Sequence, residues 1–314
     1  MAVTWSDEID DVLASDLTVA LAYPTPAGGV VVAPVAPIGL RDREAGTVSF
    51  TTSLGFGRKL ERIRRDPRVA LSYHTREHGF SRSGCFVHVQ GTATPRRLDP
   101  ETLRREVGGR SERFMGPPRT GRFWDGWLRE YYQDRLVVDV AVTRVVVWRD
   151  LQCGGEPLVA GDPLPAAPPA AQAEPAKGAG PRLDSVRAAA RLRTLPHCLL
   201  GYLQADGHPA VVPVTAGSGG ADGIRLTSRG APLPLGGRRA GLMAHSFRAK
   251  LVGLEMRQHT GWLTADRPDA AVYAPHTARG FRAPPNKTLL LLANGLMAKK
   301  GLRDARRSGA ADRV

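Results

Sequence analysis

The sequence has 314 residues, of which 42% are hydrophobic and 24% are charged. This is the composition of a globular chain, and its length excludes a single small module and suits two domains. The formal net charge is +14, and 38 of the 44 basic residues are arginine. A positive net charge is compatible with a nucleic acid, a phosphorylated cofactor or an acidic substrate as partner. The arginines are scattered along the sequence, so they do not favour one of these partners over the others.

Cysteine content and the N-terminal residues indicate a reducing compartment. Cys85, Cys153 and Cys198 are odd in number and far apart, which excludes a disulfide framework and a paired-cysteine metal knuckle. Residues 1–11 are acidic and polar, unlike a signal peptide, and the apolar run at 289–293 is too short to span a membrane. We therefore expect a cytoplasmic protein without a membrane partner.

The first half of the chain is predicted to form short β-strands. Residues 23–35 hold two apolar runs on either side of Gly28, which is the pattern of a β-hairpin. Further strands are predicted in the order 45–52, 69–74 and 86–93, and 137–148 is expected to supply the closing strands of a barrel.

One basic helix is predicted between the strands at 45–52 and 69–74. It follows a pair of glycines, carries Leu60 and Ile63 at the i, i+3 spacing of one face, and stops at Asp66 before a proline. Its sequence is GRKLERIRR, beginning at Gly57.

Two further segments, at 124–131 and 289–307, are predicted to be helical. Trp124, Trp127 and Tyr131 follow the i, i+3, i+7 spacing of one helix face, so they are predicted to pack in a core or to form a wall over a cofactor. Residues 289–307 are predicted to form a helix with a basic tail that packs on its own domain.

A Pro/Ala-rich segment at 156–181 divides the chain. Its 26 positions contain seven Pro, eight Ala and three Gly, a composition typical of an extended spacer. This linker leaves a first domain at 1–155 and a second domain at 182–314.

The second domain repeats the pattern of the first. Residues 202–214 align with 23–35 without a gap, and both segments end in V-x-P-V around a turn glycine. The later strand segments align in the same order, which places His245 against His74 and Gly261 against Gly91. Five short strands per copy predict a small antiparallel barrel that occurs twice.

The two copies differ where the first carries its basic helix. In the second copy, Pro232 and Pro234 exclude a helix between the corresponding strands. The basic helix is therefore predicted only once.

Three segments of the first copy resemble a known family. TVSFTT at 47–52, GRKLERIRRDPRVAL at 57–71 and VHVQG at 87–91 resemble the pyridoxamine 5'-phosphate oxidase-like split-barrel superfamily. That superfamily includes FMN proteins, haem-binding relatives and oxidoreductases that use coenzyme F420. The resemblance covers about residues 15–98 and, more weakly, 195–275. It implies a mainly β fold with flanking helices, built from two tandem split β-barrels of the FMN-binding type.

The segment around Gly57 also has the chemistry of a phosphate site. Free N–H groups at a helix start attract an anion, and the glycines let the backbone approach it closely. The resemblance assigns the cofactor phosphate to Thr51, Arg58 and Lys59, where the arginine can bind a phosphate through two hydrogen bonds. Further cofactor-binding candidates are Pro34, Val35, Phe50, Thr52, Ser53 and Gly57. The alternative is a solvated basic helix that packs through its apolar face.

The sequence departs from true pyridoxamine-phosphate oxidases. Ala33 and Ile38 stand where the matching strand of those enzymes begins with Arg and ends with Lys, and their C-terminal Arg and Trp signature has no match. A role in vitamin B6 oxidation is therefore not expected. Pro34, Val35 and Ala36 would still present apolar surface to a flat ring.

Four histidine and cysteine residues of the first copy are candidate catalytic groups or ligands. His74 is the candidate that donates a proton or hydrogen bond to a substrate, with a solvent-exposed loop histidine as the alternative. His74, His78, Cys85 and His88 have the residue types of a zinc site but not a common spacing, so no metal is expected. A haem with a histidine ligand stays open because relatives of this fold bind haem.

Together these features predict an FMN- or F420-dependent oxidoreductase that transfers a hydride to or from a small organic substrate. In single-domain relatives the cofactor lies between two subunits, so the two copies are expected to form a pseudo-dimer within the chain; a further homodimer is left open. The alternative is a non-catalytic split-barrel protein that binds haem or flavin. A nucleic-acid-binding module is least favoured, because no contiguous basic stripe with interleaved aromatic residues occurs.

Overall fold

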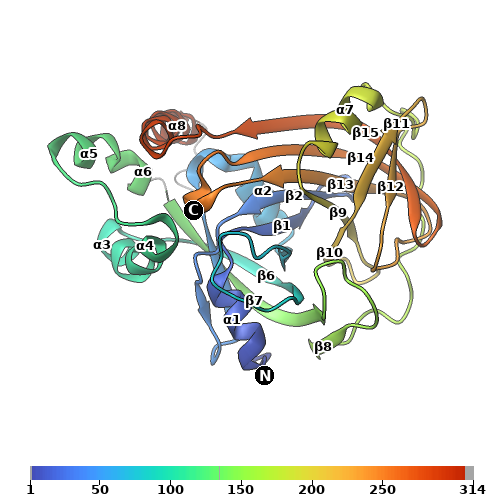
Figure 1. Cartoon of the computed structure of the whole chain (residues 1–314), viewed down its shortest axis with the longest axis horizontal. Coiled ribbons are helices and arrows are strands. Elements are labelled where there is room, and N and C mark those ends of the chain that lie inside the picture. The colour runs from blue at the N-terminus through green and yellow to red at the C-terminus, as the bar shows by residue number, and fades with distance from the viewer. Residues whose placement is uncertain (1, 134, 308–314) are drawn as a thin grey trace.

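The computed structural model describes residues 2–133 and 135–307, which form two antiparallel sheets with helices at their edges (Figure 1). The first sheet has eight strands. They are β1 (Val19–Pro24), β2 (Val30–Val35), β3 (Arg41–Asp42), β4 (Thr47–Ser53), β5 (Arg68–Tyr73), β6 (Phe86–Arg97), β7 (Arg135–Trp148) and β8 (Leu158–Gly161). The second sheet has seven strands. They are β9 (His197–Leu203), β10 (Pro209–Pro213), β11 (Thr215–Gly219), β12 (Ile224–Thr227), β13 (Gly236–Ser246), β14 (Glu255–Arg267) and β15 (Ala270–Arg282).

The two sheets have the same strand order. The first runs β2-β1-β5-β6-β7-β4-β3, with β8 added beside β7, and the second runs β10-β9-β13-β14-β15-β12-β11. Each strand on the first path therefore has a counterpart on the second. The predicted fold class, mainly β and duplicated, is confirmed by this pairing. Each copy has seven strands on this path, whereas five were predicted. Strand β3 has only two residues, too few to show an alternating pattern, and the closing strands β7 and β15 are part of the same path.

Both hairpins turn in the same way. Gly28 and Gly207 have φ angles of 76° and 80°, and this left-handed conformation favours glycine. In each turn the glycine N–H donates to a carbonyl three residues earlier, that of Thr25 or Gln204. The prediction of two equivalent hairpins is confirmed.

A second pair of glycines marks a β-bulge in each copy. The register between β6 and β7 shifts at Gly91, and that between β14 and β15 shifts at Gly261. A Cβ atom at Gly91 would lie 2.2 Å from the Ala141 carbonyl oxygen, and one at Gly261 would lie 2.1 Å from that of Ala274. The neighbouring strand thus approaches each bulge closely enough to require glycine.

The predicted basic helix is α2 (Gly57–Arg65), which follows a 3₁₀ turn, η1 (Leu54–Phe56). Leu60 and Ile63 are buried on its inner face, and Asp66 is its C-cap. Between β12 and β13 the described chain contains no helix, as expected. The other helices are α1 (Asp7–Ser15), α3 (Pro100–Leu103), α4 (Gly109–Met115), α5 (Arg122–Trp127), α6 (Arg129–Gln133), α7 (Ser185–Arg193) and α8 (Lys287–Arg307), with the π-helix η2 (Arg104–Gly108) and the 3₁₀ turn η3 (Ala249–Leu251).

The aromatic segment does not form one continuous helix, contrary to the prediction. Helix α5 ends before Leu128, which is buried, and α6 begins after it, so Trp124 and Tyr131 lie on different helices. Trp127 packs against α8, where a Cβ at Gly295 would meet its indole nitrogen at 2.3 Å.

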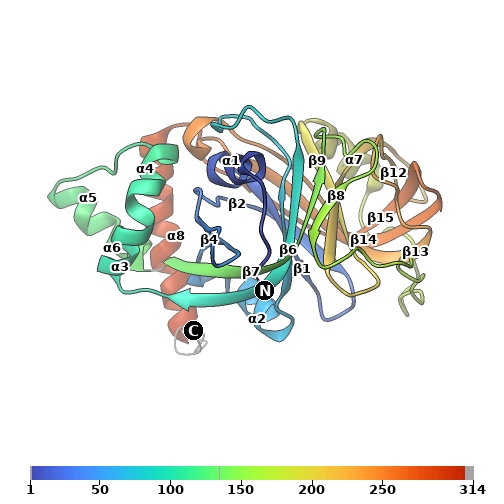
Figure 2. The ribbon, with the colours of Figure 1, turned by 90° about the horizontal axis from the view of Figure 1, so that it is seen from below.

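The prediction that the C-terminal helix packs on its own domain was wrong. Helix α8 belongs to the second half but contacts η1 and α6 of the first half. Leu302 forms a buried cluster with Leu54, Leu60 and Leu136. Figure 2 shows α8 between the layer of α3–α6 and the first sheet. The described residues contain no helix with the length and apolar character needed to cross a membrane.

The two halves pack through equivalent strands. Strand β2 lies against β9, β13 and β14, and its counterpart β10 lies against β1 and β5. Because β9 and β13 are the counterparts of β1 and β5, the two contacts are related by an approximate two-fold axis. One buried apolar cluster crosses this boundary, joining Val30 and Val32 to Leu200, Val211 and Leu242.

The predicted linker is partly ordered against both halves. Residues 158–161 form β8 on the edge of β7, so the first sheet continues past the expected boundary at 155. Gln172 donates from its side-chain amide to the Gly28 carbonyl and accepts from the Arg239 N–H. Since proline lacks an N–H and cannot support a central strand, the segment follows the surface as an edge strand and an irregular strap.

Candidate functional site

The predicted phosphate segment forms a turn between β4 and α2. Ser53 ends the strand, and its hydroxyl accepts the N–H of Gly55 at 2.9 Å. That turn carries the chain through η1 into α2, which begins at Gly57 as predicted. Phe56 precedes the helix without a side-chain cap, so the first N–H groups of α2 have no side-chain acceptor from it.

Side chains of β4 alternate between the barrel core and the outer face. Phe50, a predicted cofactor-binding residue, is completely buried, and its side chain packs in the first core. Thr52 shares its face and is 2% exposed, and its hydroxyl has no hydrogen-bond partner among the described residues. Thr51 and Ser53 lie on the other face and are partly exposed.

Two cations lie close together beside this turn. Lys59 is half-buried and its ammonium lies 4.7 Å from the centre of the Phe56 ring. Burial, and then the nearby charge of Arg135, lower the pKa of Lys59 to about 7. Arg135 lies opposite Ser53 on β7 and stacks on Tyr131, to whose hydroxyl it donates. Among the described residues, no carboxylate offsets the charge on Lys59.

Helix α8 borders the same turn. The Cα atoms of Gly55 and Gly301 come so close that a Cβ on either would lie 2.9 Å from the other. Arg58 remains exposed. The start of α2 is therefore covered on its apolar side by the second half, while one of its cations faces solvent.

The edge that was predicted to hold a flat ring is mostly covered. Val35 is 9% exposed and belongs to the first core, while Pro34 is partly exposed. Beyond them, Ala36 packs against a buried apolar cluster. The cluster consists of Leu17, Ile38, Leu40, Phe114 and Phe247.

His74, the predicted catalytic residue, lies at the boundary between the halves. Its Nδ1–H donates to the Ser72 carbonyl at 3.0 Å, and its Nε2 lies 2.7 Å from Nε2 of His245. Burial lowers the pKa of His74 to about 3 and the pKa of His245 well below its usual value. A neutral histidine whose two nitrogens are both engaged is a poor proton donor in this geometry.

His88, another of the four residues with the chemistry of a zinc ligand, is also engaged. His88 Nδ1 accepts from the Ser72 hydroxyl at 2.8 Å, and its Nε2 lies 3.3 Å from the Pro209 carbonyl of the second half. Neither His74 nor His88 thus offers a free nitrogen to a haem iron. Among the described residues, no group of three His, Cys, Asp or Glu side chains is arranged to hold a metal ion.

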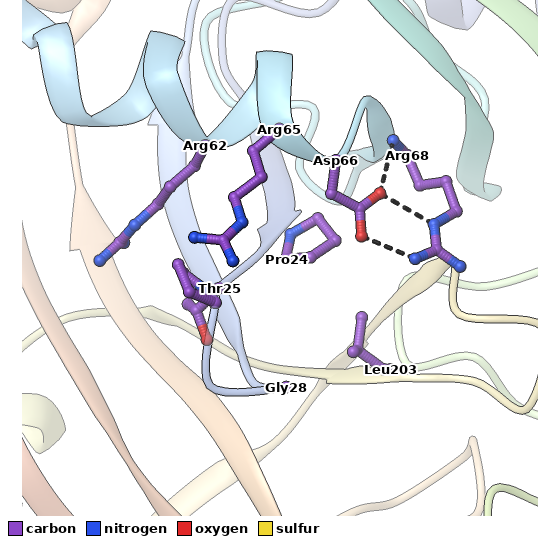
Figure 3. Close-up of a pocket in the computed structure, with 9 residues that line it drawn as sticks. Pro24, Thr25, Gly28, Arg62, Arg65, Asp66, Arg68 and Leu203 are labelled. Carbon is purple, nitrogen blue, oxygen red and sulfur yellow. Dashed lines mark hydrogen bonds and ion pairs between the residues drawn. The ribbon is translucent and has the colours of Figure 1, made fainter.

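Two cavities lie at the boundary, and neither is lined by residues 51–59 of the described chain. The smaller, of about 290 Å³, lies beside the end of α2, where Arg62 and Arg65 extend toward the Thr25–Gly28 turn (Figure 3). Arg68 beside it is paired with Asp66 at 2.6 Å. Arginines at a helix C-terminus stabilise its negative end, which accounts for this cluster.

The larger cavity, of about 760 Å³, is lined by both halves. Its walls come from the loop at 74–77, the turn at 151–152, the start of β9 at 196–199, the end of β10 at 213–215, and Arg229. His74 lines it, but the other predicted site residues do not.

No family model matches the sequence, and no curated protein matches it. Solved structures do. The conserved hypothetical protein Rv2991 from Mycobacterium tuberculosis is 24% identical with a TM-score of 0.35, over 47% of this chain and 86% of that chain. A protein from Clostridium acetobutylicum, related to general stress protein 26 and of the pyridoxinephosphate oxidase family, is 10% identical with a TM-score of 0.34, over 48% and 90%. An F420 reductase is 18% identical with a TM-score of 0.31, over 43% and 94%.

Sequence reasoning missed several residues of these sites. Arg135 lies some 75 positions beyond Lys59, and only the pairing of β4 with β7 brings it to the turn. His197 and Arg229 line the larger cavity with the 74–77 loop, which is far away in sequence. The alignment of His245 with His74 was the one available signal, since equivalent residues near a two-fold axis can meet.

Proposed function

We propose that the chain binds a phosphorylated flavin or deazaflavin, FMN or coenzyme F420, through the turn between β4 and α2, and acts as an oxidoreductase on a small organic substrate. The observation that carries this proposal is the pair of cations Lys59 and Arg135 at the start of α2. Like charges brought together with partial burial repel each other, and an anion between them removes that cost.

Other groups at the turn fit a phosphate as well. The start of α2 offers N–H groups without a side-chain cap, and a helix of nine residues adds its positive end. The partly exposed Thr51, on the same face of β4 as Ser53, supplies a further hydroxyl, whereas the Thr52 hydroxyl is buried on the other face. Arg58, at the exposed rim, is assigned to the phosphate as the family resemblance implies.

The bound ring would supply the hydride chemistry, and this chain's residues would bind it, orient it and exclude water. Arg58, Lys59 and Arg135 fix the phosphate end. Helix α8 lies against the turn through Gly55 and Gly301, so the second half helps to shield the site from water. The second half thus acts as the partner subunit of a pseudo-dimer without a basic helix of its own.

The test is a titration of the purified, ligand-free protein with FMN and with F420, followed by fluorescence. A charge-assisted hydrogen bond contributes about 1.5–3 kcal/mol, so the double variant Lys59→Met/Arg135→Met should weaken binding by about 100-fold or more. Arg64→Met, on the exposed side of α2, is the matched control and should bind as the parent does. Equal affinity of the parent and the double variant for both cofactors would reject the site. If the protein binds a cofactor but transfers no hydride, the result would favour the alternative of a non-catalytic flavin-binding protein.

A further inference from the structure

The larger cavity lies at the edge of the second half that corresponds to the edge at residues 34–36 of the first half, where the first half is covered. Pro213, Val214 and Thr215 line it, and by the gapless alignment they are the counterparts of Pro34, Val35 and Ala36. In the first half, Phe247 helps to fill the space beside Ala36. The counterpart of Phe247 in the other copy is Arg76, which lines the cavity instead of filling it. The duplication has thus left one edge closed and its counterpart open.

The open edge at residues 213–215 has no counterpart of the turn at residues 51–59 that is proposed to bind a phosphate. Arg229 follows β12 at the position that corresponds to Ser53, and the chain continues to β13 without a helix. A helix start and its N–H groups are therefore absent from this part of the described chain. Arg229 itself is exposed and forms no ion pair with a carboxylate among the described residues.

The remaining cations and acids at the cavity are already paired. Arg76 binds Asp16, and it also donates to the carbonyls of Ser83 and Cys85. His197 Nε2 lies 3.2 Å from a Glu77 carboxylate oxygen. Among the described residues, Arg229 is thus the cation at the cavity that remains to bind an incoming anion. The contact of His197 with Glu77 is not a well-aligned hydrogen bond, so the His197 ring is left as a second polar group at the cavity.

Part of the remaining lining is apolar. The buried side chains of Leu199 and Val214 line the cavity together with Pro196 and Pro213. A volume of about 760 Å³ lies within the range of sites for small organic ligands.

We propose that this cavity between the two halves is a second ligand site, which binds a small organic anion with an apolar body, its carboxylate or phosphate on Arg229 and a polar atom near His197. The ligand need carry no nucleotide, because no helix start is available for one. This proposal depends on different residues from the phosphate turn, so either site can fail without the other.

Binding can be measured on the full chain by NMR of the histidine imidazoles. Benzoate and phenyl phosphate are the two anionic probes, and benzyl alcohol is the neutral probe of similar shape. We expect saturable shifts of the His197 signals with at least one anion, at dissociation constants of about 1 mM or below, and none with the alcohol. The signals of His276, which does not line the cavity, should not move. The anion that binds more tightly distinguishes a carboxylate ligand from a phosphate ester.

Two variants locate the interaction. Arg229→Met should weaken anion binding by about tenfold or more, because a charged hydrogen bond is lost. Arg225→Met, an exposed arginine of β12 that does not line the cavity, is the matched control. Thr215→Trp places an indole at the exposed mouth and should block binding without touching the arginine. Equal shifts with the alcohol, no saturable shift with either anion, or unchanged affinity in Arg229→Met would overturn the proposal.

Discussion

His74 and His245 are counterparts in the two copies, and their Nε2 atoms lie 2.7 Å apart. Because Nδ1 of His74 donates to the Ser72 carbonyl, its Nε2 carries the lone pair and His245 must donate. Nδ1 of His245 is buried without a partner among the described residues. The contact therefore needs a neutral His74, and burial keeps His245 neutral as well. It joins the halves near their approximate two-fold axis.

Stability should fall as the pH is lowered. Burial holds the pKa of His74 at about 3 and that of His88 at about 4, below the ordinary value of 6.5. The unfolded chain takes up protons below pH 6.5 while the folded chain does not, so each such histidine costs about 1.4 kcal/mol per pH unit between these limits. Urea unfolding from pH 7.5 to 4.5 measures the slope. His245→Phe should make it shallower by about one proton, with exposed His78→Gln as control; an unchanged slope would contradict the assignment.

The ion pair between Arg144 and Asp206 should stabilise the contact between the halves. Arg144 donates to an Asp206 carboxylate oxygen at 2.9 Å, and its side chain is only 6% exposed. Asp206→Asn keeps the shape but leaves the buried guanidinium without its counter-charge, at a cost of about 2–3 kcal/mol for a partly exposed partner. Urea unfolding compares it with the exposed Asp222→Asn. Equal stabilities of the two variants would show that the pair contributes nothing.

The bulge glycines should be equally intolerant of a side chain. Gly91→Ala and Gly261→Ala each place a Cβ against a backbone oxygen that cannot move independently of its sheet, which should cost about 3 kcal/mol or more. Gly109→Ala in α4 meets no atom within 4 Å and should raise stability by about 0.4–1 kcal/mol. Thermal unfolding gives the ranking. A tolerant Gly261 beside an intolerant Gly91 would mean that the bulges are not equivalent.

The close contact of α8 with the phosphate turn depends on a glycine on each side. Gly301→Val would force the backbones apart at Gly55, so hydrogen exchange over residues 287–307 should become faster by about tenfold or more, equivalent to about 1.4 kcal/mol. Arg303→Val is the control, because it introduces the same β-branched residue at an exposed position of α8. It therefore measures the effect of valine on helix propensity without the loss of a contact. Similar exchange in both variants would argue against docking through Gly301.

Affinity for FMN should fall as the pH rises above 7. The pKa of Lys59 is lowered to about 7, so the free protein loses this charge above that pH, whereas a bound phosphate would hold the proton on the ammonium. Titrations between pH 6 and 9 should show the loss in the parent and not in Lys59→Met. A slope that survives in Lys59→Met would assign the pH dependence to another group.

Several elements could be predicted from the sequence because their causes are local. Gly28 and Gly207 fix two turns, and Leu60, Ile63 and Asp66 mark the face and end of α2. Each of these depends on residues within about one helical turn or one hairpin. The broken aromatic helix at Leu128 was not predicted, because burial of that side chain depends on packing across the molecule.

Of the candidate sites, only the parts that are contiguous in sequence could be predicted. The turn from Thr51 to Lys59 is contiguous, so its hydroxyls, glycines and cations could be read together. Arg135 reaches it only through the pairing of β4 with β7, and Gly301 only through the docking of a helix from the other half.

By itself, the sequence determined the local elements of this protein: the repeated hairpins, the equivalent glycines Gly91 and Gly261, and the single basic helix. These follow from backbone freedom and from the spacing of apolar residues along the chain. The tertiary structure alone decided which edge between the halves is closed and which is open. That choice depends on whether Phe247 or Arg76 faces the edge, and on where α8 docks, and both depend on contacts between residues far apart in the chain.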